Sequence, residues 1–315
     1  PMSFIFNGPG SGLKTTRIKP QDPEYTRMAE NATDLELDGV VYIGGNDSAD
    51  QVLGMARHAG IQSVHAIKTV DNDLPCTHHS PGYGSAALYN ATALKNVDND
   101  FRSYGVKGHF DQSGNVVTGM SVAPVVIYQV MGRKAGWLSL ATAFASVDPR
   151  GTLVPDNPPH IVLCKEVTFD KAAFLARVSE VIDQVGRCVI VVQEDLTDRG
   201  TGTSIAEVYG TDIVRDDHGN IQHGRSTSFS PATFLARLVE SELDVPASVP
   251  GMVKDCVLNP QHIQRSCMMS TVDASEAYMV GYSAVEALVS GETEKSVILE
   301  RSEGVTRTGL TDMSN

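Results

Sequence analysis

The sequence predicts an α/β fold built on parallel β-sheets. Short runs of β-branched and apolar residues alternate with longer segments of helical character, and polar or glycine-rich stretches follow most of the runs. The alternation is clearest where the run 39–45, the helical segment 48–60 and the run 63–70 follow one another, which is the order of a βαβ unit. No low-complexity tract or short repeat interrupts the pattern, so we expect α/β architecture throughout.

Each predicted element has its own local signal. The run GVVYIGG (39–45) is rich in β-branched residues and ends in glycines, as buried parallel strands do. The segment 48–60 has helical character and ends at Gly60, and 63–70 is the next strand. The remaining expected elements are a helix over 81–97, a strand over 121–132 leading into a helix, a strand over 160–166, a helix over 169–186, a strand over 187–196 and a hairpin over 216–231.

Composition excludes several classes of protein. The chain has 315 residues and a formal net charge of −13, which disfavours a broad basic face for nucleic acid. No apolar run approaches the length of a membrane span, so we expect no membrane partner. The five cysteines are scattered without a CxxC pair, which indicates a reducing compartment rather than a disulfide framework. We therefore expect a cytoplasmic protein.

Three polar clusters follow predicted strands. They are GGNDS (44–48), KTVDND (68–73) and MGRK (131–134). In open α/β sheets, ligands bind beyond the carboxyl ends of the strands. Ordinary turn chemistry would explain any one of these clusters, but three together indicate a ligand site.

The cluster KTVDND carries the groups that phosphoryl transfer requires. Lys68 can neutralise a transferring phosphate, and either Asp71 or Asp73 can accept a proton from an attacking hydroxyl. The other aspartate can hold Mg²⁺ or orient the first. Capping of the next helix is the alternative, and it accounts for one aspartate only.

The other segments are suited to anions. GGNDS offers backbone N–H groups at the start of a helix, and MGRK adds Arg133 at a second helix start. The segment NPQHIQRS (259–266) contributes His262 and Arg265, which share one side if the segment is helical. A structural histidine with an arginine as its surface neighbour is the alternative for that pair.

Together these four segments resemble the phosphofructokinase family, over about residues 8 to 300. Within the family the chain is most similar to the pyrophosphate-dependent 6-phosphofructokinases. In the members that use ATP, a glycine stands where this chain has Asp47, and another glycine stands where it has Lys68. The acid and the lysine together match the pyrophosphate pattern.

The resemblance implies a role for each matching residue. Asp71 is expected to be the catalytic base, with Lys68 and Asp47 completing the catalytic group. The substrate-binding residues that it implies are Thr69, Asp71, Met131, Gly132, Arg133, Glu166, His262 and Arg265. Gly45, Arg17 and Lys68 are expected to bind the phosphoryl donor, and Asn46, Asp47 and Asp73 to hold Mg²⁺.

It also implies an architecture of two Rossmann-like three-layer lobes, with the active site in the cleft between them. The phosphoryl-donor lobe is expected to hold 1–80 with about 266–300, without the strand and Gly-rich loop that open the family's fold. The sugar-phosphate lobe is expected to hold 81–265 with 301–315. A homodimer or homotetramer is expected, although Pro124 and Cys256 stand where neighbouring subunits of the family supply arginines.

The implied activity is a glycolytic one. Mg²⁺-dependent, reversible transfer from pyrophosphate to the 1-hydroxyl of fructose 6-phosphate would give fructose 1,6-bisphosphate and phosphate. An ATP-dependent kinase, or one that prefers sedoheptulose 7-phosphate, is the alternative within the class. A non-catalytic regulatory subunit is the alternative of another class, and the charges retained in KTVDND and MGRK argue against it.

Overall fold

A computed structural model gives the structure of the chain. It describes residues 11–16, 18–102, 108–110, 113, 116–118, 125–211, 213–215, 221, 229–243 and 257–313. The chain divides into two compact units. Unit 1 comprises Pro1–Ala86, Arg215–Asn220 and Arg265–Asn315, and unit 2 comprises Ala87–Val214 and Ile221–Gln264.

Unit 1 is built on a four-stranded sheet in the order β1-β2-β9-β10. The strands are β1 (Val40–Gly44), β2 (Ser63–Ile67), β9 (Lys295–Ser302) and β10 (Val305–Asp312). β2 pairs in parallel with both β1 and β9, and β10 pairs antiparallel with β9. The helices of the unit are α2 (Asp22–Asp34), α3 (Asn46–His58) and α11 (Thr271–Val289).

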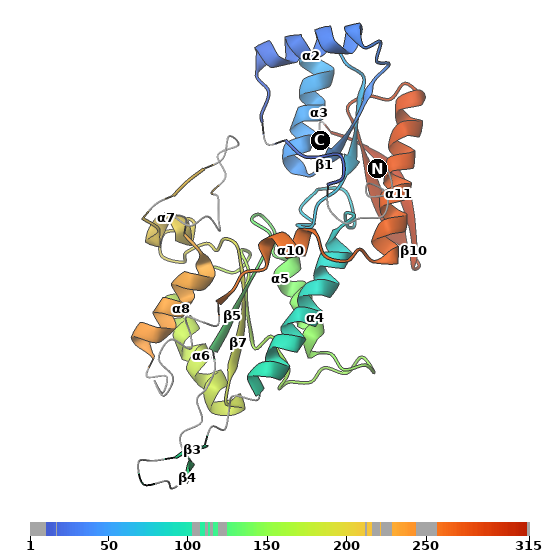
Figure 1. Ribbon diagram of the computed structural model, residues 1–315. Helices are drawn as coiled ribbons and strands as arrows, with labels where there is room; N and C mark the ends of the chain where they lie inside the picture. The colour runs from blue at the N-terminus through green and yellow to red at the C-terminus, as the bar shows by residue number, and fades with distance from the viewer. Residues whose placement is uncertain are drawn as a thin grey trace. The chain divides into compact units, whose positions relative to one another are not determined.

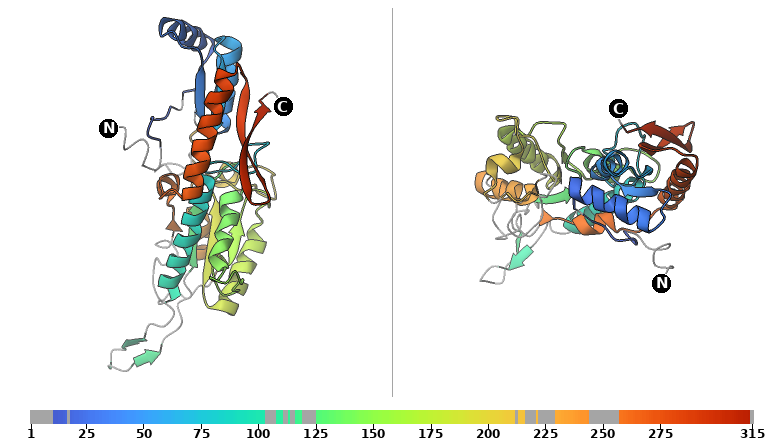
Figure 2. Two further views of the ribbon diagram at one scale, coloured as in Figure 1. Left: turned by 90° about the vertical axis from the view of Figure 1, so that its right-hand side faces the viewer. Right: turned by 90° about the horizontal axis from the view of Figure 1, so that it is seen from above.

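The alternation of side chains along β1 explains the three layers of unit 1. Val40 and Tyr42 pack with Met55 of α3 and with α2, whereas Val41 lies in the cluster formed by α11. The helices α3 and α11 therefore cover opposite faces of the sheet, as Figures 1 and 2 show. This arrangement leaves the carboxyl ends of β1 and β2 side by side, as their parallel register requires.

Unit 2 contains a fully parallel sheet in the order β6-β7-β5-β8. Its strands are β5 (Val125–Val130), β6 (Ile161–Leu163), β7 (Cys188–Gln193) and β8 (Val257–Leu258). In a separate two-stranded sheet, β3 (Gly108–Phe110) pairs antiparallel with β4 (Val116–Thr118). The helices, with α4 starting in unit 1, are α4 (Tyr83–Phe101), α5 (Trp137–Ala141), the 3₁₀ helix η2 (Thr142–Ser146), α6 (Lys171–Val185), α7 (Ile205–Tyr209), α8 (Pro231–Glu242) and α10 (Gln261–Arg265).

The core of unit 2 forms on both faces of this sheet. Every residue of β5 and β7 is buried, which fits their continuous apolar runs. One face packs against α6 and α8, through side chains such as Val178 and Leu235. On the other face Tyr128 donates a hydrogen bond to Asn90 of α4, and Figure 1 shows α4 and α5 on that side.

The α/β class predicted from the sequence is confirmed, and two expected details need correction. The tail 301–315 was expected in the sugar-phosphate lobe, but β10 pairs with β9 along its whole length and belongs to unit 1. The strand expected over 160–166 ends at Leu163, so Glu166 lies in the following turn. The hairpin expected over 216–231 falls mostly outside the described residues.

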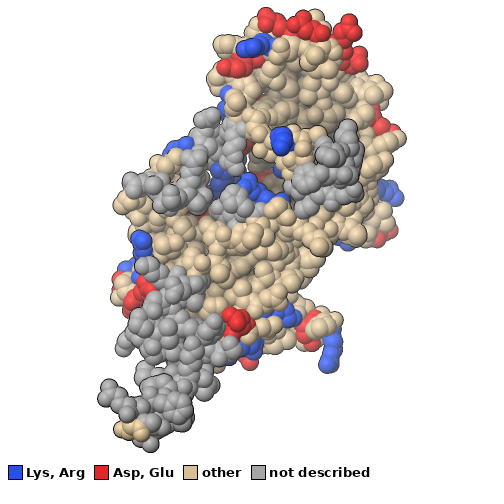
Figure 3. All heavy atoms as spheres, viewed as in Figure 1, with Lys and Arg blue, Asp and Glu red and all other residues tan. Residues whose placement is uncertain are grey.

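The surface of unit 1 carries much of the acidic character. Figure 3 shows Asp and Glu side chains gathered over α2, where Asp22, Glu24, Glu30 and Asp34 are exposed. Within the described part of the chain, no helix has the length and apolar character needed to cross a membrane.

Candidate active site

The turn between β1 and α3 forms the first part of the candidate site. A Cβ atom at Gly44 would lie 1.9 Å from Oγ of Ser48, so the close approach of the strand to the helix start requires glycine there. Gly45 is the N-cap, and α3 begins at Asn46, two residues earlier than expected. Asn46 and Asp47 therefore stand in the first turn of a helix, where the backbone N–H groups favour negative charge.

The end of β2 lies directly beside this turn. The N–H of Lys68 donates to the carbonyl oxygen of Gly44 at 2.9 Å, which extends the parallel pairing past the last strand residue. A Cβ atom added at Gly45 would lie 3.5 Å from Cβ of Thr69, so Thr69 is a close neighbour of this glycine. The segments GGNDS and KTVDND are thus brought together by strand register.

A buried histidine of β2, His65, bonds to residues of the two neighbouring strands β1 and β9. His65 is 1% exposed, and its Nε2 lies 2.9 Å from the same Gly44 carbonyl oxygen, while Nδ1 lies 3.0 Å from Oγ of Ser296 on β9. Burial lowers the pKa of His65 to about 4, although the bond to Gly44 acts in the opposite direction. Its ring is therefore neutral near pH 7.

Lys68 carries the positive charge of this cluster. Part of its side chain is exposed, but the surrounding protein removes enough water to lower the pKa of the amine. The charge of Arg265 lowers that pKa further, and Asp71 opposes the shift. The three charges therefore lie near enough to influence one another, which is the arrangement expected where an anion is bound.

The two aspartates lie in the loop that follows. Thr69 accepts the N–H of Asp71 on its Oγ1 at 3.2 Å. Nδ2 of Asn46 donates to Oδ2 of Asp73 at 2.7 Å, so the start of α3 holds the second aspartate directly. Asn72 between them has φ of 54°, a left-handed conformation that asparagine tolerates better than most residues. Asp71 and Asp73 are both half-buried.

The oxygen atoms near this loop could hold a divalent cation. Asp47, Asp73 and Asn46 offer carboxylate and amide oxygens, which are the hard ligands that Mg²⁺ prefers. The described residues contain no group of three or more His, Cys, Asp or Glu side chains arranged for a metal. Mg²⁺ is commonly held by one or two carboxylates together with substrate phosphates, so these residues fit that mode.

The end of β5 provides a second group of residues, within unit 2. Gly132 has φ of 107°, and a Cβ atom there would lie 2.9 Å from the carbonyl oxygen of Ala135, so the turn after Met131 requires glycine. Arg133 in this turn is half-buried. The N–H of Met131 donates to Oε1 of Gln264 at 2.9 Å, which joins the turn to α10.

Glu166 lies next to this turn. Its Oε1 accepts the N–H of Gly136 at 2.7 Å, and the side chain is otherwise exposed enough to meet a ligand. The side chain of Gln193 lies beside them and bridges two loops, with Nε2 donating to Ala135 at 3.1 Å and Oε1 accepting the N–H of Lys165 at 2.9 Å. Glu166 and the Met131–Arg133 turn are therefore fixed relative to each other.

The expected helical character of the HIQR segment is seen in α10. Arg265 is exposed and belongs to unit 1, where its charge affects Lys68. The side chain of His262 and the whole of Arg17 lie outside the described residues. The expected residues thus form two groups, one in each unit, with Gly45, Asn46, Asp47, Lys68, Thr69, Asp71, Asp73 and Arg265 in unit 1 and Met131, Gly132, Arg133 and Glu166 in unit 2.

Two buried glutamines were missed by the sequence reasoning. Gln193 and Gln264 are both 0% exposed, and each binds the backbone of a loop that carries expected site residues. Gln193 ends the apolar run CVIVVQ, and Gln264 stands between His262 and Arg265. A polar amide at a position that strand or helix periodicity makes inward-facing was the available signal.

Comparison with known proteins decides the family. The family described as Phosphofructokinase matches residues 2–108 and 116–288, which together are most of the chain. The chain belongs to the phosphofructokinase family. The motifs that indicated it from the sequence lie within the matched ranges.

Relatives in this phosphofructokinase family carry a more specific name. The chain is 32% identical over 307 residues to the pyrophosphate–fructose 6-phosphate 1-phosphotransferase of Rhodospirillum rubrum, covering 95% of this chain and 68% of that protein. It is 33% identical over 305 residues to the protein of the same name from Xanthomonas campestris pv. campestris, covering 93% of this chain and 64% of the relative.

A solved structure agrees with these sequence matches. The crystal structure of pyrophosphate-dependent phosphofructokinase from Nitrosospira multiformis aligns with a TM-score of 0.67 and 28% identity, over 94% of this chain and 64% of that one. The chain thus spans about two thirds of the length of the relatives that it matches.

Proposed function

We propose that this chain catalyses Mg²⁺-dependent, reversible transfer of a phosphoryl group from pyrophosphate to the 1-hydroxyl of fructose 6-phosphate. The products are fructose 1,6-bisphosphate and phosphate, and the reaction serves glycolysis. The names of the relatives support this activity. A cytoplasmic location and a homodimer or homotetramer belong to the same proposal.

The single observation that carries the proposal is the cluster of Lys68, Asp71 and Arg265. A lysine with a lowered pKa stands beside a carboxylate and a second cation, at the carboxyl end of a parallel strand. Phosphoryl transfer needs such cations to stabilise the charge of the transferring group and a base close to them. ATP-using members of the family have glycine in place of this lysine, so the cluster favours pyrophosphate.

The residues of unit 1 take the donor and the proton. Asp71 accepts the proton of the sugar 1-hydroxyl, and Thr69 orients Asp71 through its backbone N–H. Lys68 stabilises charge on the transferring phosphoryl group, and Gly45 and Arg17 line the donor. The first turn of α3 adds its backbone N–H groups to this electrostatic environment.

The remaining residues hold the sugar phosphate. Met131, Gly132 and Arg133 bind it from the turn after β5, and Glu166 accepts hydrogen bonds from sugar hydroxyls. Arg265 and His262 of α10 bind the 6-phosphate through charge-assisted hydrogen bonds. The bond between Gly136 and Glu166 supports this role, because it holds one carboxylate oxygen and thereby orients the side chain.

Asp47, Asp73 and Asn46 would hold Mg²⁺. When bound, the ion supplies neutralising charge to the phosphoryl oxygens. The amide nitrogen of Asn46 donates a hydrogen bond to Asp73 and orients that carboxylate. The atoms left to bind the ion are then the carboxylate oxygens of the two aspartates and the amide oxygen of Asn46. An amide is the weaker ligand, so Asp47 or Asp73 takes the main contact, directly or through water.

Asp47 also sets the choice of donor. Where it lies about 4 Å from a third phosphoryl group, repulsion at an effective dielectric near 20 is on the order of 4 kcal/mol. That energy corresponds to roughly a thousandfold loss of binding. Pyrophosphate has no third group, so Asp47 rejects the long donor while Lys68 favours the short one.

The test compares donors and sugars in one assay. Turnover on fructose 6-phosphate is measured with pyrophosphate and with ATP, and then repeated with sedoheptulose 7-phosphate as acceptor. We expect wild type to use pyrophosphate, Asp47→Gly to gain ATP-dependent turnover, and the double variant with Lys68→Gly to lose pyrophosphate use. Asp50→Gly is the matched control, because Asp50 is an exposed residue one turn further along α3. A wild type that prefers ATP would contradict the donor assignment.

A further inference from the structure

The loop that carries the proposed catalytic carboxylates is long and irregular. Between β2 and α4 the chain runs from Lys68 to Gly82 with a single β-bridge, between Thr69 and Gly82. Such a loop does not hold a side chain in place by itself, because the conformational freedom of each residue has to be restrained by specific bonds. A general base misplaced by 1 Å can cost about 100-fold in rate.

The first restraint closes the loop on itself. Oδ1 of Asn72 accepts the N–H of Ser80 at 3.0 Å, and Oγ of Ser80 donates to the carbonyl oxygen of Thr69 at 2.9 Å. Ser80 is 0% exposed. The segment with Asp71 therefore moves together with residues 77–80, and whatever holds those residues also positions the carboxylates.

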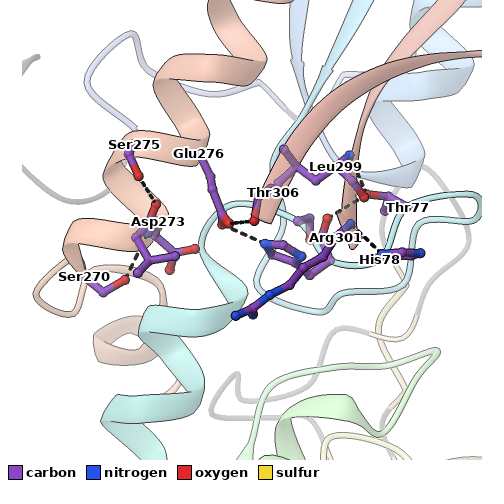
Figure 4. Close-up of polar contacts among 12 residues, drawn as sticks. Thr77, His78, Ser270, Asp273, Ser275, Glu276, Leu299, Arg301 and Thr306 are labelled. Atoms are coloured by element: carbon purple, nitrogen blue, oxygen red, sulfur yellow. Dashed lines mark hydrogen bonds and ion pairs between the residues drawn. The ribbon is translucent and has the colours of Figure 1, made fainter. Parts of the chain in front are cut away.

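The second restraint joins the loop to β9, as Figure 4 shows. The N–H of His78 donates to the carbonyl oxygen of Leu299 at 2.9 Å, and Oγ1 of Thr77 accepts the N–H of Leu299 at 3.0 Å. Nδ1 of His78 accepts the N–H of Arg301 at 2.7 Å. These bonds hold one side of the loop and involve mainly the backbone of β9.

The third restraint is a short contact between the half-buried side chain of His79 and the buried carboxylate of Glu276. Nε2 of His79 lies 2.7 Å from Oε2 of Glu276 on α11, with side-chain exposures of 18% and 5%. The other oxygen of Glu276 accepts the hydroxyl of Thr306 on β10 at 2.9 Å. The two oxygens of Glu276 thus have separate partners, Thr306 on β10 and His79 in the loop.

We propose that His79 is a positioning residue, which acts through Glu276 to hold Asp71 and Asp73 in their reactive places. The proposal rests on the proposed function, because it assigns the loop a catalytic role. Among the described residues, the side chain of His79 is bonded to Glu276 rather than to an expected site residue. It fixes the adjacent Ser80, which in turn binds Asn72 and Thr69 on either side of Asp71.

The test uses three variants that separate positioning from stability. His79→Ala removes the link between the loop and Glu276. His79→Gln keeps a side-chain N–H that can reach the same carboxylate oxygen. Thr306→Val is the matched control, because it removes the other hydrogen bond of the same buried carboxylate without touching the loop.

We expect His79→Ala to lower kcat by roughly 10-fold to 100-fold while the KM values for both substrates stay nearly unchanged. His79→Gln should restore most of the turnover. Thr306→Val should lower Tm about as much as His79→Ala does, yet keep wild-type kcat. Near-normal turnover in His79→Ala would overturn the proposal, as would an equal loss in Thr306→Val.

A readout without activity separates this proposal from the proposed function. Hydrogen exchange of the Asp71 and Ser80 amides, both bonded within the loop, should accelerate in His79→Ala and stay at the wild-type rate in Thr306→Val. If wild type shows no pyrophosphate-dependent turnover, the proposed function fails. The exchange rates still decide whether His79 holds the loop, and unchanged rates in His79→Ala would refute that.

Discussion

Acidification should destabilise the protein through His65, whose ring contacts Gly44 beside the candidate site. The folded-state pKa of this histidine is about 4, against the ordinary value of 6.5, because the ring is buried between Gly44 and Ser296. In the unfolded chain His65 takes up a proton below about pH 6.5, whereas in the folded chain it does so only near pH 4. His65 therefore does not change the free energy of unfolding above about pH 6.5, and it lowers that free energy as the pH falls from about 6.5 to about 4.

The expected size of this effect follows from the linkage relation. One pH unit within the window costs about 1.4 kcal/mol, so lowering the pH from about 7.5 to about 5.5 should remove about 1.4 kcal/mol through His65 alone. The full shift, from 6.5 to about 4, is worth about 3 kcal/mol at lower pH. Other groups also titrate here, so the comparison has to be made between variants.

Urea unfolding at the two pH values measures the effect. We expect wild type to lose about 1.4 kcal/mol more than His65→Gln over this interval, because glutamine has no proton to take up. The difference between wild type and His65→Gln, measured at both pH values, isolates the contribution of His65. Equal losses in wild type and His65→Gln would refute the reasoning.

Three further predictions concern catalysis. Asp71→Asn should lower turnover by roughly 10²–10⁴-fold with little change in sugar-phosphate affinity, and near-normal turnover in steady-state assays would remove Asp71 from the role of base. Arg133→Ala should raise the fructose 6-phosphate KM by about 10-fold to 100-fold and leave the pyrophosphate KM unchanged. Lys134→Ala is the control, because Lys134 is the exposed neighbour. Equal effects on both KM values would contradict the assignment. The pKa of Lys68 is lowered, so the pyrophosphate KM of wild type should rise at alkaline pH as this lysine loses its proton. Lys68→Arg should abolish that rise, because arginine keeps its charge. An unchanged rise in the variant would show that another group is responsible.

Local signals were enough to predict the strands that bear the donor-side residues. β1 and β2 are short apolar runs that end in glycine or charge, and their parallel pairing brings Gly45 against Thr69. Strand register accounts for that contact, and the order of a βαβ unit already implies parallel strands with neighbouring carboxyl ends. The assignments of Lys68 and Asp71 to catalysis remain predictions that the assays above address.

Positions that depend on contacts distant in sequence could not be predicted. Gln264 meets Met131, and His79 meets Glu276, across separations of 133 and 197 residues. Helical or strand periodicity marks a residue as inward-facing but does not name its partner. The same limit applies to β10, because its antiparallel pairing with β9 depends on the turn at Glu303 and Gly304. The resemblance to the family had placed this segment in the other lobe.

The pairing of β2 with β9 has a consequence for synthesis on the ribosome. Val64 lies opposite Lys295, so the middle of this sheet closes only after the long intervening stretch of chain has been made. Unit 2, whose described strands end at Leu258, has all of those strands translated earlier than β9. A nascent chain interrupted before β9 would therefore expose one side of β2 and leave the loop of Asp71 without its anchors at Leu299 and Arg301. Such an intermediate would have an unpaired strand edge, and the synthesis of β9 adds the last supports of the loop to those that α3 and α11 already provide.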